Sequence, residues 1–405
     1  MAKNGITERR NKTNKKFMVL SALGIFMVVD HHTFITFNFF GDFIPYNSFF
    51  MPMFVFISGY FNKVDSSTKL LPYIWKKIKS LLIPYIFLSA LAFGLQFLID
   101  WYKTGEIPSV PDGYLKYLLE RAVTIGSSIS IAEPMWFVIS LFAVLLVYAL
   151  LKKCLGKIWN SFVALGIFTC LHVLSVDYSM NLLEDASPYI LLPLKIIFFL
   201  PFLEMGIIYR KYLEKKHEAM PAGAKIALLL SLLITNMVRM LYLPMPYDVA
   251  FDALGEMMGF TSPFTITPMV SSIVGILFWL TLVDLVGKPF YESRFVNYMS
   301  ANTFWIMGLH IAFFNILNCI LMFINNNLIE LRFFNVEFFQ ITEWYFWDLS
   351  PNLKLLYLTA GILGPLGLKW IYDMLFSLPA RIKRAGNGGE GSNEPENPDK
   401  SGNEG

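Results

Sequence analysis

Long runs of apolar residues follow one another along nearly the whole chain. A transmembrane helix needs about 20 consecutive apolar residues, and stretches of this length alternate here with shorter polar segments. The expected spans are residues 17–38, 44–61, 80–99, 134–151, 159–176, 187–208, 224–244, 263–283, 302–325 and 354–376. The pattern predicts an all-α fold, a polytopic transmembrane helix bundle of about ten spans.

Composition narrows the class of protein. Hydrophobic residues make up 55% of the 405 residues and the mean hydropathy is +0.52, values typical of a protein whose solvent is the lipid bilayer. The net charge of +3 is too small to suggest a nucleic acid partner. Three cysteines lie far apart without paired spacing (Cys154, Cys170 and Cys319), so we expect neither a disulfide framework nor a metal site.

Basic residues are distributed unevenly between the two sets of connecting segments. With ten spans, 24 Lys and Arg residues fall in the set that includes both termini and four in the opposite set. Cytoplasmic loops carry the excess of Lys and Arg, so both ends are expected in the cytoplasm. The resulting division is a basic cytoplasmic N-terminus (1–16), a membrane domain (17–376) and a cytoplasmic, largely disordered tail (377–405).

Two longer segments lie on the expected outer side. Residues 113–123, GYLKYLLERAV, place leucines on one helical face and predict an amphipathic helix in the interface, or a lid over a substrate groove. Residues 326–353 are rich in aromatic side chains, which indicates an interfacial belt.

An ionisable cluster, Asp30, His31 and His32, lies in the otherwise apolar first span. Such residues are costly inside a membrane and mark functional sites. His32 has the chemistry of a general base, and His31 is its near competitor. Asp30 is about 200° from His32 around a helix, so no Asp–His pair is expected within this segment. The alternative is a histidine that reaches the interface or hydrogen-bonds a neighbouring helix.

Other polar residues occur within or beside the later spans. His310 could orient a substrate, carry a proton or simply be packed; Arg239 could bind an anion or form a structural pair. Trp136, beside Glu133, could stack on a sugar ring or belong to an aromatic belt. Lys195 and Glu204 lie near opposite ends of the sixth span, where their side chains could extend to the interfaces.

Four segments resemble the integral-membrane acyltransferase family 3, which transfers acyl groups from acyl-CoA to hydroxyls of cell-surface glycans and lipids. They are ALGIFMVVDHH (22–32), SFFMPMFVFISGYF (48–61), KKIKSLLIPY (76–85), and the pair EPMWFVISLF (133–142) and SANTFWIMGLH (300–310). In register, His32 takes the place of the family's helix-one histidine. One departure is Ser21, which stands where the family usually has Arg or Lys.

The resemblance implies an O-acyltransferase of the plasma membrane, multi-pass and bacterial, with no bound cofactor and acyl-CoA, most simply acetyl-CoA, as co-substrate. His32 or His31 would be catalytic. Lys76, Lys77 and Lys79 would bind the donor together with His310, although these lysines could instead be a positive-inside anchor. The acceptor would be a glycan or lipid-linked glycan.

Substrate-binding candidates are Glu133, Trp136, Arg239, Ser58 and Asn302, the last two as possible oxyanion donors. No Walker A loop, HExxH motif, GxSxG motif or DxD-like cluster on a cytosolic loop is present, which disfavours ATP hydrolysis, zinc proteolysis and a nucleotide-sugar glycosyltransferase of the common metal-using type. Two alternatives stay open: a transporter or flippase of a polysaccharide intermediate, and a non-catalytic subunit on the same fold.

Overall fold

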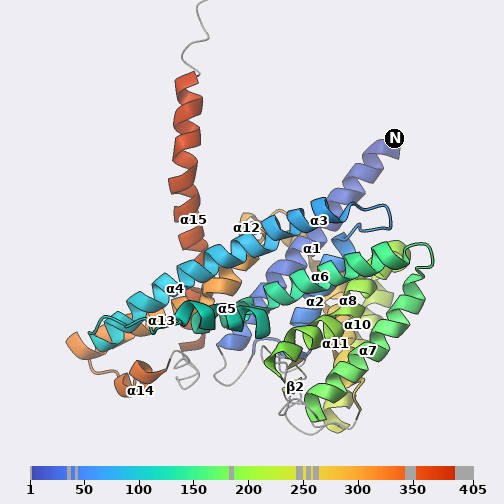
Figure 1. Ribbon diagram of the computed structural model, residues 1–405. Coiled ribbons are helices and arrows are strands. Elements are labelled where there is room, and N and C mark those ends of the chain that lie inside the picture. Colours follow the sequence, from blue (N-terminus) through green and yellow to red (C-terminus); the bar gives the residue numbers. More distant parts are fainter. Residues whose placement is uncertain are drawn as a thin grey trace, which may run out of the picture.

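The structure is a computed structural model, and it describes residues 2–33, 38–41, 44–181, 187–242, 250–251, 257–258, 264–342 and 353–387. Nearly all of these residues are helical, which confirms the all-α polytopic bundle (Figure 1). The α-helices are α1 (Ala2–His32), α2 (Phe50–Phe61), α3 (Leu70–Lys77), α4 (Ile83–Thr104), α5 (Tyr114–Thr124), α6 (Trp136–Leu155), α7 (Ser161–Asn181), α8 (Leu191–Ile208), α9 (Glu214–Ala219), α10 (Ala222–Tyr242), α11 (Thr267–Val286), α12 (Arg294–Ala301), α13 (Thr303–Asn327), α14 (Val336–Ile341) and α15 (Lys354–Asn387).

Short helical turns and one small ribbon complete the described chain. They are η1 (Tyr46–Ser48), η2 (Ile78–Leu82), η3 (Ser130–Met135), η4 (Pro188–Ile190), η5 (Tyr209–Leu213) and η6 (Lys288–Phe290), with β1 (Ala250–Phe251) antiparallel to β2 (Met257–Met258). η2 joins α3 to α4 and η5 joins α8 to α9 without a break, so each pair forms one long helical unit.

Eight helical units among the described residues are long and apolar enough to cross a membrane. The first two expected spans are shorter than predicted. α2 has 12 residues, about 18 Å at 1.5 Å per residue, and the apolar part of α1 ends at His32 rather than at residue 38. A hydrocarbon core of about 30 Å is therefore not crossed by α2 alone.

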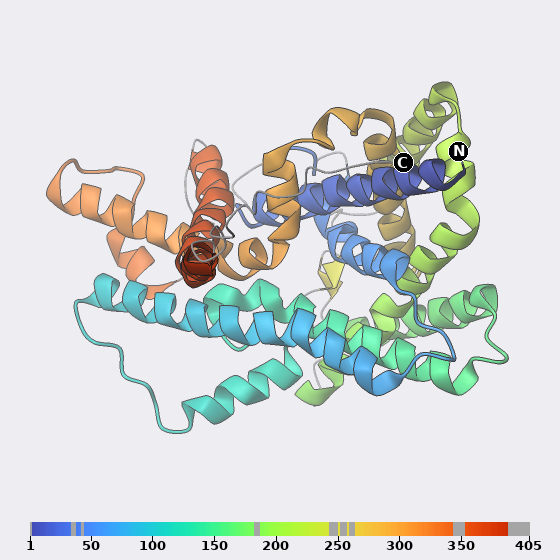
Figure 2. The same ribbon diagram turned by 90° about the horizontal axis from the view of Figure 1, so that it is seen from above.

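α13 is the central helix of the site-bearing half of the bundle. It contacts α1, α4, α15 and η3, and its buried face runs from Ile306 to Met322. Figure 2 shows α1 between α11 and α12 on one side and α2 on the other. The side chains of α1 from Phe17 to Val29 are largely buried, so α1 is held in place on several faces.

α2 and α8 approach each other more closely than side chains would allow. A Cβ added to Gly59 would lie 2.0 Å from the Leu203 carbonyl oxygen, and one added to Gly206 would lie 2.1 Å from the Phe56 carbonyl oxygen. Glycine at these two positions permits direct backbone packing, as in other membrane helix pairs. This contact fixes the short α2 against a full-length span.

The amphipathic helix α5 and the two terminal helices can be compared with the expected elements. α5 confirms the helix expected at 113–123, and Leu115 and Leu119 on it are exposed. α15 continues to Asn387, well past the expected end of the last span at 376. The N-terminal end of α1 and the C-terminal part of α15 extend in the same direction (Figure 1). Most of the expected tail, and residues 343–352 of the expected aromatic belt, lie outside the described residues.

Candidate active site

Two histidines from opposite ends of the sequence meet at the end of α1. His32 is the last residue of α1, and His310 lies fully buried in the second turn of α13. His310 Nε2 is 3.1 Å from His32 Nδ1, and the ring centroids are 4.9 Å apart. The residues are separated by 278 positions, so only the tertiary fold brings them together.

Helix carbonyls determine where the protons of these two rings lie. His32 Nδ1 is 2.8 Å from the Val28 carbonyl oxygen, and His310 Nδ1 is 2.8 Å from that of Ile306. A carbonyl oxygen can only accept, so each Nδ1 carries the hydrogen of its neutral ring. His310 Nε2 then accepts from His32 Nδ1–H, and His32 Nε2 keeps its lone pair. His32 is half-buried, so Nε2 with its lone pair is the basic atom that a substrate can approach.

His31 lies beside this pair but faces another direction. Its ring centroid is 5.6 Å from that of His32 and 5.8 Å from that of Phe50 on α2. The imidazole–imidazole hydrogen bond joins His32 and His310, and His31 is not part of it. This geometry favours His32 over His31 as the base.

A buried ion pair fixes the end of α1 next to the histidines. Lys354 Nζ, at the start of α15, lies 2.8 Å from Asp30 Oδ1 and also donates to the Asp30 carbonyl oxygen and to Thr33 Oγ1. Asp30 and Lys354 are both almost completely buried. Asp30 Oδ2 accepts from the Phe39 backbone N–H at 2.9 Å. The carboxylate therefore binds Lys354 rather than a histidine, as its position on the helix predicted.

Lys354 is a site residue that the sequence pattern alone does not reveal. By hydropathy it is only the first residue of the last expected span. A usable signal was present, because Lys354 begins an apolar helix on the side of the membrane where basic residues are otherwise few. Its partner Asp30 is 324 positions away, which sequence spacing cannot reveal.

The three lysines proposed for the donor lie together at the α3–η2 junction. Lys76 and Lys79 are exposed and Lys77 is half-exposed. Two of them stand over neighbouring aromatic rings, Lys77 over Tyr73 at 5.5 Å and Lys79 over Trp75 at 5.3 Å. They form a basic surface, separate from the histidine pair.

Trp136 does not present its ring to solvent for a sugar. It is 7% exposed and lies beside Phe199, with ring centroids 6.2 Å apart. The Nζ of Lys195 lies 5.0 Å from the Trp136 ring centroid and donates to the Ile125 carbonyl oxygen at 2.6 Å. Glu133, one turn earlier in η3, is half-buried. The Trp136 surroundings are those of a packed residue in the bundle.

Lys195 and Glu204 are both fully buried, so the expectation that they reach the interfaces is wrong. Each has a specific partner instead: Lys195 binds a backbone carbonyl, and Glu204 Oε2 accepts from the Tyr148 hydroxyl at 2.6 Å. Buried polar groups in a membrane are satisfied within the protein, which explains both contacts.

The remaining candidates lie away from the histidine pair. Asn302 directly precedes α13, eight positions before His310 or about 12 Å along the axis, and its amide donates to the Tyr298 carbonyl oxygen. Ser58 lies eight residues beyond Phe50, the α2 residue that contacts His31. Arg239, on α10, donates to the Asn236 side chain. The structure does not bring these three residues to His32.

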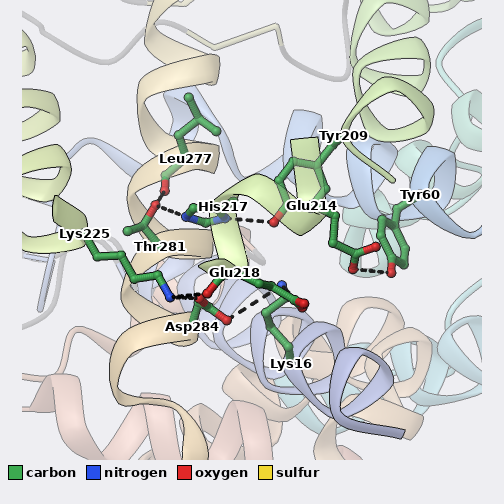
Figure 3. A network of polar contacts seen from close by, with 10 residues as sticks. All are labelled: Lys16, Tyr60, Tyr209, Glu214, His217, Glu218, Lys225, Leu277, Thr281 and Asp284. Atoms are coloured by element: carbon green, nitrogen blue, oxygen red, sulfur yellow. Dashed lines mark hydrogen bonds and ion pairs between the residues drawn. The ribbon is translucent and has the colours of Figure 1, made fainter. Parts of the chain in front are cut away.

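A second network of polar contacts, centred on ion pairs between four helices, lies at the end of the bundle where α1 begins (Figure 3). Lys16 lies 3.3 Å from Glu218 and 3.8 Å from Asp284, and Lys225 lies 2.6 Å from Asp284. These pairs connect α1, α9, α10 and α11. They place the charges of Lys16 and Lys225 inside the protein rather than at its surface.

His217 occupies the centre of Figure 3 and its proton position is also determined. Thr281 Oγ1 donates to the Leu277 carbonyl oxygen, so it accepts from His217 Nε2–H at 3.1 Å. His217 Nδ1 then accepts from the Tyr209 hydroxyl at 2.8 Å. Both ring nitrogens of His217 therefore make hydrogen bonds to neighbouring segments, which gives His217 a structural role.

Within the described part of the chain, no group of three or more His, Cys, Asp or Glu side chains is arranged to hold a metal ion. The chemistry available at the histidine pair is proton transfer. His32 Nε2 can act as a base while His32 Nδ1–H donates to the His310 imidazole, and this arrangement suits the removal of a proton from a hydroxyl.

Comparison with known proteins identifies the family. No curated protein and no solved structure matches the chain. The sequence model of the family described as an acyltransferase domain, acyltransferase family 3, matches residues 17–372, from the start of the apolar run of α1 to near the end of the last span. The match covers most of the chain and both histidine-bearing helices. The protein belongs to the acyltransferase family 3 and is a multi-pass membrane acyltransferase.

Proposed function

We propose that the protein is an O-acyltransferase that moves an acyl group, most simply acetyl, from acyl-CoA to a hydroxyl of a cell-surface glycan or glycolipid. The single observation that carries this proposal is the hydrogen-bonded pair His32–His310, which leaves His32 Nε2 as an accessible base in an apolar bundle. Family membership supplies the reaction type, acyl transfer.

In the proposed reaction, His32 alone accepts and returns the proton. His32 Nε2 takes the proton of the acceptor hydroxyl while its oxygen attacks the thioester carbonyl carbon. The C–S bond breaks as the tetrahedral intermediate collapses, and the CoA thiolate recovers the proton from His32 Nε2–H. His310 Nε2 accepts from His32 Nδ1–H throughout, which orients the imidazole and stabilises its charged form.

The donor is proposed to approach from the basic side of the bundle. Lys76, Lys77 and Lys79 present ammonium groups there, and these bind phosphate as point charges. They would compensate for Ser21, which stands in place of the family's basic residue. The acceptor would reach His32 from the opposite side, where α5 and α14 lie. The proposed location is the plasma membrane of a bacterium.

The test is acyl-CoA binding and CoA release by detergent-purified protein, with a panel of acyl chain lengths and simple sugars as acceptors. We expect saturable binding and slow CoA release in the wild type. His32→Ala should lose release by about 10²-fold or more, the usual contribution of a general base, while binding stays within a few-fold.

Two variants control this experiment. His31→Ala removes the competing histidine and should keep most activity. His172→Ala removes a buried histidine of α7 that bonds the Phe198 carbonyl oxygen elsewhere in the bundle, and it reports the effect of a lost buried imidazole. Wild-type turnover in His32→Ala would overturn the assignment of the base. Absence of CoA release with every donor would contradict the proposed acyltransferase activity and favour a transporter or a non-catalytic subunit.

A further inference from the structure

An apolar pocket of about 620 Å³ lies between α1, α10, α11 and α12. Its walls include Ala22 and Leu23 on α1, Leu233 on α10 and Phe278 on α11. No side chain that lines it is charged. The volume is within the range of small-molecule sites, roughly 300–1,000 Å³, and the lining admits only an apolar ligand.

The pocket is separate from the histidine pair. Leu23, on its wall, and His32 are nine positions apart on α1, which places them on opposite faces of the helix at 100° per residue. α1 therefore stands between the pocket and the basic nitrogen of His32. An acyl group undergoing transfer at His32 does not occupy this space.

The length of the pocket corresponds to one leaflet of a bilayer. On α11 its wall extends from Phe278 to Gly287, nine positions, or about 13 Å at 1.5 Å per residue. Half of a typical hydrocarbon core is about 15 Å. Phe40 lines the pocket at the end away from the cytoplasm, and its ring centroid lies 5.4 Å from that of Trp279.

Positive charge is exposed where the pocket reaches the expected cytoplasmic side. The lining residues at that end are Gly287, Phe290 and Val296. Two basic residues that lie between them in the sequence, Lys288 and Arg294, are exposed. In the described part of the chain neither of these two forms an ion pair, whereas nearby Lys16 and Lys225 are neutralised by Glu218 and Asp284 (Figure 3).

We propose that this pocket is a binding site for an anionic phospholipid of the cytoplasmic leaflet, which inserts one acyl chain between α1, α10 and α11 and places its phosphate near Lys288 and Arg294. Three observations agree on this occupant: a lining without charge, a depth of one leaflet, and unneutralised basic residues at the headgroup level. The bound chain would fill space between α1 and its neighbours, and so support the helix that carries His32.

The experiment is native mass spectrometry of the delipidated full-length protein, titrated with phosphatidylglycerol and with phosphatidylcholine of the same chains. We expect one molecule of phosphatidylglycerol to bind at least about tenfold more tightly than phosphatidylcholine, since each basic residue near the headgroup favours an anionic lipid. A photoactivatable acyl chain on phosphatidylglycerol should cross-link to the pocket walls on α1, α10 or α11 of the wild-type protein.

Two kinds of variant separate the chain from the headgroup. Ala22→Phe and Leu233→Trp fill the pocket from opposite walls and should each abolish the tight site. The control is Leu230→Trp, at an exposed position one turn away on α10. Lys288→Gln with Arg294→Gln should remove the preference for phosphatidylglycerol, whereas Lys157→Gln, an exposed lysine of another loop, should not.

Several results would overturn the proposal. Equal affinity for the two lipids, or cross-links outside the pocket walls, would show that no such anionic lipid site exists here. Displacement of the bound lipid by long-chain acyl-CoA would assign the pocket to the acyl donor instead. None of these results depends on turnover at His32, so the lipid site and the proposed acyltransferase reaction fail or succeed independently.

Discussion

At the scale of single residues, the site depends on where two protons lie. Val28 and Ile306 provide carbonyls that hold the Nδ1–H of His32 and of His310, and this arrangement makes His310 an acceptor rather than a donor. His310 is thus a positioning residue for His32. It contacts the ring of the base and not the proposed reacting atoms.

This assignment predicts different outcomes for two substitutions of His310. His310→Gln retains a side-chain oxygen that can accept from His32 Nδ1–H, and we expect CoA release to fall by less than about tenfold. His310→Leu removes the acceptor, and we expect a loss of roughly 10²-fold with the KM for acyl-CoA unchanged. The measurement is kcat and KM across pH for both variants.

A purely structural role for His310 would give another result. In that case both variants would lose folded protein, and the fraction that remains would show the wild-type kcat and pH profile. Equal losses of kcat in His310→Gln and His310→Leu would also contradict the acceptor role.

The buried pair Asp30–Lys354 gives the second residue-scale prediction. Lys354→Met leaves the Asp30 carboxylate buried without its cation, and breaking a buried pair in this way costs about 3–5 kcal/mol. The double variant Asp30→Asn with Lys354→Met leaves no charge and should recover much of that loss. The measurement is the free energy of unfolding in mixed micelles.

Lys369 and Asp373 provide the matched control on the same helix. They also form an ion pair on α15, but Asp373 is half exposed, and such surface pairs contribute only about 0–1 kcal/mol. Lys369→Met should therefore change the free energy of unfolding little. If Lys354→Met behaves like Lys369→Met, the pair does not fix the end of α1.

What the sequence could predict at this scale follows from distance along the chain. The Asp30–His31–His32 cluster is local, so an apolar run interrupted by charge was enough to locate it. His310 and Lys354 also stood out as polar residues in or at the start of spans, but their contacts cross 278 and 324 positions. No periodicity in the sequence encodes such pairings, and the role of Ser58 and Asn302 as oxyanion donors stays a prediction.

At the scale of elements, the close contact of α2 and α8 explains how a 12-residue helix is held in the bundle. Gly59→Ala or Gly206→Ala would place a methyl group against backbone atoms at 2.0–2.1 Å, which the helices can relieve only by moving apart. Overpacking of this kind costs about 1–3 kcal/mol. We expect a lower melting temperature for both variants in detergent.

Gly94 on α4 is the matched control, since a Cβ added there meets no atom within 4 Å. Gly94→Ala should raise the melting temperature slightly or leave it unchanged, because alanine favours a helix over glycine by about 1 kcal/mol. The same small effect in Gly59→Ala would show that α2 and α8 are not in backbone contact.

Element boundaries were predictable where hydropathy alone sets them. The expected bounds of the spans that correspond to α6, α7, α8, α10, α11 and α13 agree with the structure to within a few residues. α2 was too long in the prediction because Tyr46–Ser48 and Phe49, which precede it, are apolar or uncharged and yet form a separate turn. The α3–η2–α4 unit was too short because Lys76, Lys77 and Lys79 interrupt the apolar pattern without interrupting the helix.

At the scale of the whole molecule, the distribution of basic residues predicts the sidedness of the bundle more firmly than the number of spans. α1 and α2 can either each cross the membrane or together enter it and return to the cytoplasmic side. The chain is on the cytoplasmic side after α2 in both cases, so every later loop lies on the same side as in the ten-span arrangement. The two ends of the described chain extend in one direction, in agreement with this parity (Figure 1).

This sidedness can be measured with single cysteines. The protein has three native cysteines, and Cys154 is exposed in the basic segment expected in the cytoplasm. A variant with only Cys154 should react with a membrane-impermeant maleimide in inside-out vesicles and not in intact cells. Asp112→Cys in a cysteine-free background, placed in the exposed loop before α5, should react in intact cells. The opposite pattern would invert the bundle, move the lysines of α3 and η2 to the outer side, and so remove the proposed route for a cytoplasmic acyl-CoA.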